Sequence, residues 1–474
     1  MRIVCVFLLM LAAGVCPSAA NAGAETAQKR NAPLNIVLIF ADDQRSDTIG
    51  ALGNSVIRTP NLDRLVHQGV SFRRAYMQGG MHGATCMPSR AMLLSGQNLF
   101  HIDEKLVRSK TWPEAFRNAG YETFASGKWH NGDESLGRIF PEARSMFTGG
   151  MTNPLEAKLR DVSAGKVLPA ELCPKHACEA FTDEVINFIR KDHSAPFLAY
   201  LPFDGPHDPH IVPDDFPVRY SPDDIPLPDN FLPQHPIDNG EMTVRDEQLL
   251  PWPRPEHDVR VMLAEYYRYV SFLDVQVGRV LDALEATKQM DNTIVIFAAD
   301  SGVARGSHGL IGKQNLYEHS VRVPLVISGP GIAKDQTTDA LCYLFDLFPT
   351  LGARCGVKSP NESDGMDLSP VLADPKKTAR TGLMFAYRDL QRAVTDGEWK
   401  LIRYPKINRT QLFNLADDPS ERTNLIEQAE HKEVQARLLT QLRSEMKASG
   451  DNAPLEVDSP KVAEWTPPAE GKKK

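Results

Sequence analysis

The chain has 474 residues, which is enough to bury a large hydrophobic core and to form one large domain with a smaller one beside it. Acidic residues outnumber basic ones by 61 to 53, and the formal net charge is −8. This balance gives no electrostatic reason to expect nucleic acid as a partner, so any anion-binding site must be a local basic pocket.

Residues 1–22 have the features of an export signal. Arg2 gives a short positive end, residues 4–15 form an almost unbroken apolar run, and Ala20-Asn21-Ala22 is a small-residue cleavage site. The run is too short to span a membrane comfortably, and no later run is long and apolar enough to do so. We therefore expect a cleaved signal peptide over 1–22 and a periplasmic or secreted protein without a membrane span.

Apolar runs of strand length alternate with helical patterns after this leader. The run 35–40 shows no polar alternation, which is typical of a strand buried on both faces. Further strands are expected at 121–126, 196–202, 293–299 and 323–328, and helices from Thr59 onward, over 112–119, around 181–189 and around 273–284. This order predicts an α/β sandwich.

The pattern changes past residue 374. Short strand-like runs at 383–387, 392–396, 399–404 and 411–415 precede a charged helix over about 427–446. We expect a main domain over 23–374 and a small antiparallel-sheet subdomain with a helix over 375–450. Residues 451–474 are rich in Pro, Glu and Lys, which predicts a flexible tail. The proline-rich segment 213–255 of the main domain predicts a long surface loop.

Cys86 begins a predicted helix in which Pro88 occupies the first turn and Arg90 lies one turn along the same face. The positive end of a helix, with an arginine beside it, favours an anionic group. Such a place suits a nucleophile that acts on a negatively charged substrate. The alternative is a buried structural cysteine or one half of a disulfide.

The cysteine count bears on this choice. Removing the signal peptide leaves Cys86, Cys173, Cys178, Cys342 and Cys355, which is an odd number. If Cys173 pairs with Cys178 and Cys342 with Cys355 in an oxidising compartment, Cys86 is the cysteine left over. The sequence alone does not determine this connectivity.

Acidic residues follow two of the apolar strands. Asp42 and Asp43 come after the first strand, and Asp300 follows the strand at 293–299. Carboxylates at strand ends are costly to bury unless a cation or hydrogen bonds compensate them, and oxygen ligands suit Ca²⁺ or Mg²⁺. These carboxylates therefore indicate either a metal site or, alternatively, an ordinary solvated loop or helix cap.

Basic residues gather at similar places. Lys128 and His130 follow the strand at 121–126 and point to the same side of an extended chain, where one can hold anionic oxygens and the other exchange protons. His207 and His210 lie in a proline-rich turn. A rigid turn could aim both imidazoles into a pocket, and the pair could equally be metal ligands or surface histidines. The glycine-broken loop 307–314 carries one histidine and one lysine.

Taken together, these motifs resemble the type I sulfatases, the formylglycine-dependent enzymes of the alkaline phosphatase superfamily. The resemblance runs from about residue 35 to 425. The motifs that match in order are Thr59-Pro60-Asn61-Leu62-Asp63-Arg64-Leu65, Cys86-Met87-Pro88-Ser89-Arg90 with Leu93-Leu94-Ser95-Gly96, Gly127-Lys128-Trp129-His130, Pro206-His207, Gly312-Lys313, and Leu412-Phe413-Asn414-Leu415 with Asp418-Pro419. The resemblance implies a large central mixed sheet between helices and a small C-terminal antiparallel sheet.

The resemblance also implies a mechanism. In this family a maturation enzyme oxidises the cysteine to Cα-formylglycine, whose hydrated aldehyde is the nucleophile. One oxygen of the gem-diol at position 86 would attack sulfur and displace the alcohol. Deprotonation of the other oxygen and collapse to the aldehyde would then expel sulfate, a step that a thiol cannot perform.

Each candidate residue has a role by similarity. Arg90 would stabilise the nucleophile, Lys128 and Lys313 would hold the sulfate oxygens, His130 would be the base for the collapse, and His207 would protonate the leaving alcohol.

The resemblance implies a calcium site as well. Asp42, Asp43, the modified Cys86 and Asp300 would bind Ca²⁺, which polarises the sulfate. Ser301 stands where the family usually has asparagine, and sometimes histidine or glutamine. A serine hydroxyl is a shorter and weaker ligand, so the number of ligands is the point in doubt.

The expected substrate is a sulfated carbohydrate, and we expect His210 and His308 to contact it. The nearest alternative is a phosphate or phosphonate monoester hydrolase of the same superfamily. The other is a glycan-binding protein that keeps the pocket without maturation of Cys86 and has no catalytic activity.

Overall fold

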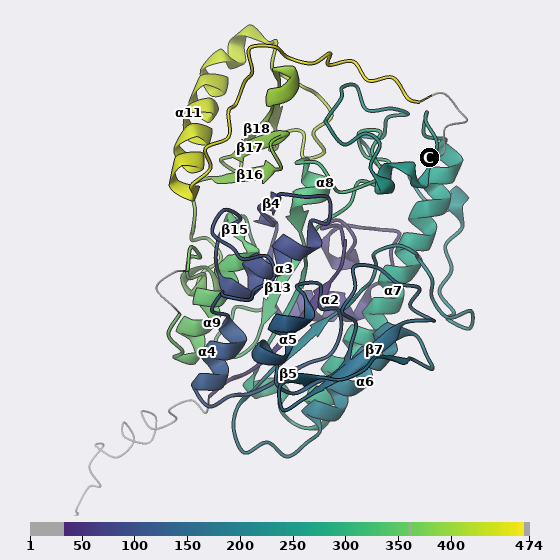
Figure 1. Ribbon diagram of the computed structural model, residues 1–474, viewed down its shortest axis with the longest axis vertical. Helices are drawn as coiled ribbons and strands as arrows, with labels where there is room; N and C mark the ends of the chain where they lie inside the picture. The colour runs from purple at the N-terminus through teal and green to yellow at the C-terminus, as the bar shows by residue number, and fades with distance from the viewer. Residues whose placement is uncertain (1–32, 360–362, 469–474) are drawn as a thin grey trace, which may run out of the picture.

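The computed structural model describes residues 33–359 and 363–468 (Figure 1). The predicted signal peptide lies outside these residues. Within them, no helix combines the length and apolar character that a membrane crossing requires.

A mixed central sheet organises the main part of the chain. In the described residues it has 11 strands in the order β14-β2-β13-β11-β1-β10-β5-β6-β7-β8, with β9 paired to β7. The strands are β1 (Asn35–Ala41), β2 (Gly69–Phe72), β5 (Glu122–Ala125), β6 (Ala143–Met146), β7 (Lys158–Ser163), β8 (Lys166–Val167), β9 (Glu171–Leu172), β10 (Phe197–Pro202), β11 (Thr293–Ala299), β13 (Leu325–Ser328) and β14 (Gln336–Thr338). Strand β1 is central, and every one of its residues is buried, as its unbroken apolar run predicts.

The strands that carry the candidate residues run parallel to one another. β1 pairs in parallel with both β10 and β11, and β10 pairs in parallel with β5. Their carboxyl ends therefore meet at one edge of the sheet, where ligand sites of open α/β sheets collect. β13 is antiparallel to β11, which makes the sheet mixed.

Two groups of helices pack against this sheet, one containing α2, α6 and α7 and the other α3, α4 and α9 (Figure 1). The helices are α2 (Pro60–Gln68), α3 (Cys86–Ser95), α4 (Trp112–Asn118), α5 (Asp133–Ile139), α6 (Ala177–Ile189), α7 (Glu256–Ala286), α8 (Glu318–Val321), α9 (Leu347–Cys355), α10 (Ser369–Ala373) and α11 (Lys432–Ser449). The predicted mixed α/β fold is confirmed. A short sheet of β12 (Arg322–Val323), β3 (Ala75–Tyr76) and β15 (Cys342–Tyr343) lies beside it.

A smaller sheet lies in the C-terminal part of the chain and is drawn in yellow-green beside α11 in Figure 1. It contains β16 (Leu383–Tyr387), β17 (Gln391–Thr395), β18 (Trp399–Tyr404) and β19 (Arg409–Asn414), which pair antiparallel in sequence order. Its fifth strand, β4 (Gly79–Gly80), comes from the main part of the chain and pairs in parallel with β16. Gly79 has a φ of +133°, and a Cβ there would lie 1.8 Å from the carbonyl oxygen of Ala386. Glycine is therefore needed where the small sheet joins the segment before Cys86.

Neither of the two disulfide pairings considered from the sequence is present in the described residues. All five cysteines in the described residues are free thiols. Cys178 points at Asp204, with its Sγ 3.1 Å from Oδ1, and not at Cys173. Cys342 lies in β15, whereas Cys355 ends α9 beside Tyr121, so that helix separates the two.

Two segments of the chain, 213–255 and 451–468, have neither α-helices nor strands. Segment 213–255 is a long connection whose only regular parts are 3₁₀ helices at Pro222–Asp224 and Arg245–Leu249. The described part of the predicted tail, 451–468, has no helix or strand and contacts the rest of the chain. Asp451 pairs with buried Arg392, and Trp465 packs its ring against Trp252 at a centroid distance of 5.3 Å.

Candidate active site

The candidate residues come together at the carboxyl edge of the parallel strands. Asp42 and Asp43 follow β1, Lys128 follows β5, His207 follows β10, and Asp300 follows β11. His130 also follows β5, Cys86 and Arg90 come from α3, and Ser301 and Lys313 come from the loop after β11.

Cys86 is the first residue of α3 and is buried. Its Sγ lies 3.1 Å from Nδ1 of His130. Burial raises the pKa of the Cys86 thiol to about 11, although Lys128 and Lys313 act in the opposite direction. An unmodified Cys86 is therefore a neutral thiol near pH 7 and a poor nucleophile.

Arg90 holds α3 against the strand ends. Its Nε donates to Oδ2 of Asp300 at 2.9 Å, and its Nη2 donates to Oδ2 of Asp42 at 3.1 Å. Its Nη1 also donates to the carbonyl of Lys128 at 3.3 Å. One residue earlier, the hydroxyl of Ser89 donates to the carbonyl of Asp300 at 2.7 Å. One buried guanidinium thus fixes the position of Cys86 relative to two carboxylates.

Asp42 has unequal oxygens. Its Oδ2 contacts both Arg90 and the ammonium of Lys128, which also donates to the carbonyl of Gly150 at 2.5 Å. Its Oδ1 is buried and has no hydrogen-bond partner among the described residues. Burial raises the pKa of Asp42, but Lys128 and Arg90 outweigh it and hold that pKa below the usual range. Asp42 is therefore an ionised carboxylate with one free oxygen.

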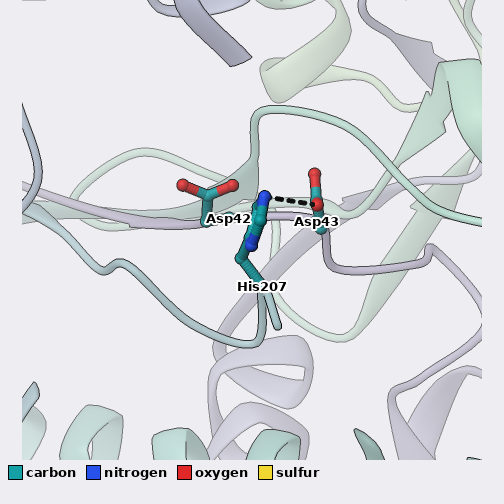
Figure 2. A group of neighbouring side chains, drawn as sticks. All are labelled: Asp42, Asp43 and His207. Atoms are coloured by element: carbon teal, nitrogen blue, oxygen red, sulfur yellow. Dashed lines mark ion pairs between the residues drawn. The ribbon is translucent and has the colours of Figure 1, made fainter. Parts of the chain in front are cut away.

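Asp43 adopts a left-handed backbone with a φ of 63°. Its two oxygens accept from Nζ of Lys313 at 2.6 and 2.7 Å, and Oδ1 also accepts from the hydroxyl of Ser301 at 2.7 Å. Figure 2 shows the imidazole of His207 between Asp42 and Asp43, with its Nε2 3.6 Å from Oδ2 of Asp43. Because a carbonyl only accepts, Nδ1 of His207 donates to the carbonyl of Asp208, at 2.8 Å.

His130 and Asp300 have shifted pKa values. Burial, together with the positive charge of Lys128, lowers the pKa of His130 to about 3, so its imidazole is neutral near pH 7 and able to accept a proton. Burial and the negative charge of Asp42 raise the pKa of Asp300 to about 6. Shifts of this kind, caused by desolvation and specific charges, are typical of functional sites.

The cluster fits a hard cation. Ligand atoms of Asp42, Cys86 and Asp300 lie within 4.8 Å of one another, as do those of Asp42, Asp43 and His207. Asp42 belongs to both groups, and its Oδ1 is an oxygen to which no donor of the described residues is bonded. Carboxylate oxygens at this density suit Ca²⁺ better than a soft metal.

Comparisons with known proteins agree with this geometry. The family model described as Sulfatase matches residues 34–357, and the one described as N-sulphoglucosamine sulphohydrolase, C-terminal, matches residues 306–448. The chain belongs to the sulfatase family. It is a sulfuric ester hydrolase.

Three related proteins illustrate the range of this sulfatase's relatives. An N-acetylglucosamine-6-O-sulfatase of Bacteroides thetaiotaomicron is 25% identical over 532 residues, covering 95% of this chain and 92% of the relative. A protein solved with its substrate D-glucosamine-2-N,6-O-disulfate superposes with a TM-score of 0.73 at 22% identity, covering 89% of this chain and 99% of the other. A phosphonate monoester hydrolase of Agrobacterium radiobacter superposes with a TM-score of 0.70 at 22% identity, covering 88% of this chain and 96% of the other. These two structures show the fold alone.

The two histidines expected to contact substrate lie in different surroundings. His210 is next to the cluster, with Nε2 3.2 Å from Nη2 of Arg305. His308 is buried under the small sheet, stacked on Tyr317 at a centroid distance of 3.9 Å, and its Nε2 donates to the carbonyl of Glu421 at 2.8 Å. Because its other nitrogen lies 3.4 Å from the amide of Asn230, His308 uses both nitrogens within the protein. The expected substrate contact of His308 stays a prediction.

Two contributions to the sulfatase site have no signal in the sequence. The carbonyl of Gly150, which orients Lys128, lies in a loop without any motif. Asp208 was inside the proline-rich turn, but nothing there indicated that it pairs with Arg245 of the long loop. Partners from distant loops leave no local pattern.

The high pKa of Cys86 gives a testable prediction for the unmodified sulfatase. At pH 8 the folded protein should react with iodoacetamide at Cys86 roughly 100-fold more slowly than the unfolded chain, because a pKa raised by about two units lowers the thiolate fraction by that factor. The rate should still rise tenfold per pH unit between pH 8 and 10. Peptide mass spectrometry measures the alkylation rate at Cys86. A rate that levels off near pH 8.5 would contradict the raised pKa.

Proposed function

We propose that this sulfatase removes sulfate from a sulfated carbohydrate after Cys86 has been converted to Cα-formylglycine. The observation that carries the proposal is the position of Cys86, whose side-chain atom lies within 4.8 Å of oxygens of Asp42 and Asp300 and 3.1 Å from His130. The names of curated relatives support a sugar substrate.

The modification supplies a hydrated aldehyde, with one hydroxyl to attack sulfur and a second whose deprotonation releases the sulfate. Sγ of Cys86 marks where these oxygens would be attached. Its contact with Nδ1 of His130 at 3.1 Å places a neutral imidazole within proton-transfer reach of that position. A formylglycine-generating enzyme is therefore a required partner, and it would act on the exported or nascent chain.

The lysines bind the reacting group. Nζ of Lys128 forms an ion pair with Asp42, and Nζ of Lys313 forms one with Asp43. Both ammonium groups are almost fully buried, where interactions with developing negative charge are stronger than in water. They would hold the sulfate oxygens, and His207, protonated at Nε2, would give its proton to the alcohol oxygen as the S–O bond breaks.

Ca²⁺ is the proposed cofactor. Asp42, Asp43 and Asp300 would hold it together with the modified Cys86, and it would supply positive charge that polarises the sulfate. Ser301 already donates to Asp43, so we propose that its hydroxyl orients that carboxylate, with direct ligation as the alternative. The predicted signal peptide supports action in the periplasm or outside the cell.

Sulfate preference is the first test of the proposal. Matured protein should hydrolyse an aryl sulfate with a higher kcat/KM than the matching aryl phosphate or phosphonate monoester. Cys86→Ala should fold and lose more than roughly 10³-fold of the sulfate activity, because the nucleophile is gone. A preference for phosphate or phosphonate would assign the site to that other reaction, and full activity of Cys86→Ala would reject the nucleophile.

Calcium binding gives a second test. After chelation, Ca²⁺ at 100 times its dissociation constant should stabilise the protein by about 2.7 kcal/mol, seen as a higher Tm in calorimetry. Asp42→Asn removes a charged ligand and should abolish most of that gain. Asp282→Asn, at an exposed position on α7, is the matched control and should keep it. Equal gains in both variants would contradict the assigned ligands.

A further inference from the structure

A cavity begins immediately beyond His207. It has a volume of about 480 Å³ and is formed by the turn after β10, by the long loop near Arg245 and by α7. Its charged and imidazole groups are Asp208, His210, Arg245, His257, Asp258, Glu265 and Arg305. Cavities of this size hold small molecules, and this one adjoins the reacting centre because Asp208 follows His207 directly.

Arg305 is the unusual group in this cavity. It is only 1% exposed, yet its Nε has no hydrogen-bond partner among the described residues. Its Nη2 is 3.2 Å from Nε2 of His210, its Nη1 is 3.7 Å from the sulfur of Met262, and the ring of Tyr266 is 5.8 Å from its Cζ. The nearest carboxylate oxygen that it faces, Oδ1 of Asp208, is 3.6 Å away, beyond hydrogen-bond distance.

Asp208 compensates the charge of Arg305 only in part, because its Oδ1 lies 3.6 Å from Nη2 in a long ion pair. Asp208 forms its short ion pair with Arg245, through the other oxygen. Burial, and then the charge of Arg305, holds the pKa of His210 well below its usual range, so that imidazole is neutral. Its Nε2 must then accept from Arg305, which leaves Nδ1 carrying a proton. A buried guanidinium that shares its carboxylate neighbour with Arg245 and keeps an unused N–H is costly unless a further anion pairs with it.

We propose that Arg305 is a specificity residue that binds a second anionic group of the substrate, a carboxylate or a further sulfate on the saccharide that carries the reacting sulfate. The planar fork of a guanidinium matches either group with two parallel hydrogen bonds. Nδ1 of His210 offers another donor. Asp258 and Glu265 on the α7 wall repel an anion, which orients the second charge toward Arg305. This inference rests on the proposed function.

Competition against aryl sulfate hydrolysis by matured protein tests the inference. One pair of competitors is N-acetylglucosamine 6-sulfate and glucosamine-2-N,6-O-disulfate, and the other is a 2-sulfated uronate and its carboxyl methyl ester. In at least one pair, the doubly charged sugar should have an inhibition constant roughly 10- to 100-fold lower than its partner, as expected for charge-assisted hydrogen bonds. The pair that shows this identifies the second anion as sulfate or carboxylate.

Variants assign the preference to a residue. In Arg305→Gln the two inhibition constants of that pair should differ by no more than about threefold. Arg305→Lys keeps the charge but not the fork, so it should fold like the wild type and lose part of the ratio. Arg268→Gln removes a charge from α7 outside the cavity and is the matched control.

The outcomes separate two failures. Equal inhibition constants within both wild-type pairs, or a ratio unchanged in the folded Arg305 variants, would overturn the role of Arg305 while leaving the sulfatase reaction intact. Matured protein that hydrolyses no aryl sulfate would instead reject the proposed function. Loss of the ratio in Arg268→Gln as well would show a general charge effect and would also overturn the inference.

Discussion

The site depends on one buried guanidinium. Arg90 donates to Asp42 and Asp300, which end two adjacent parallel strands, and it belongs to the same helix as Cys86. Without it, two buried carboxylates would face each other with less compensation, which is strongly unfavourable. The same contacts determine where Cys86 lies. Stability of the sheet edge and placement of the proposed nucleophile thus follow from one interaction.

Burial and neighbouring charges then shift the pKa values of the site residues in different directions. It raises the pKa of Cys86, which makes the thiol inert, and it lowers the pKa of His130, which makes the imidazole a free base. Asp42, beside Lys128 and Arg90, has a lowered pKa, whereas that of Asp300 is raised to about 6. Lysines that pair with Asp42 and Asp43 are already held at the place where a sulfate would bind. An inert thiol in a prepared anion site is consistent with a residue that is modified before it reacts.

Much of this could be predicted from the sequence because the signals are local. The unbroken apolar run of β1 predicted a fully buried strand, and Pro88 and Arg90 marked the start of α3. Contacts between distant segments could not be predicted in the same way. The pairing of Gly79 with Ala386 and the stacking of His308 on Tyr317 join parts of the chain with no shared pattern. Arg305 likewise has no motif, and only its burial with an Nε that has no hydrogen-bond partner among the described residues makes it stand out.

The central claim is that Cys86 acts only after its oxidation. The most direct measurement compares the aldehyde fraction at position 86, determined by mass spectrometry of its peptide, with the rate of sulfate release in the same preparations. Protein made with and without a formylglycine-generating enzyme, and mixtures of the two, provide the range. The account predicts a rate proportional to the aldehyde fraction, reaching zero for the pure thiol. Undiminished sulfate release by thiol-only protein would contradict it.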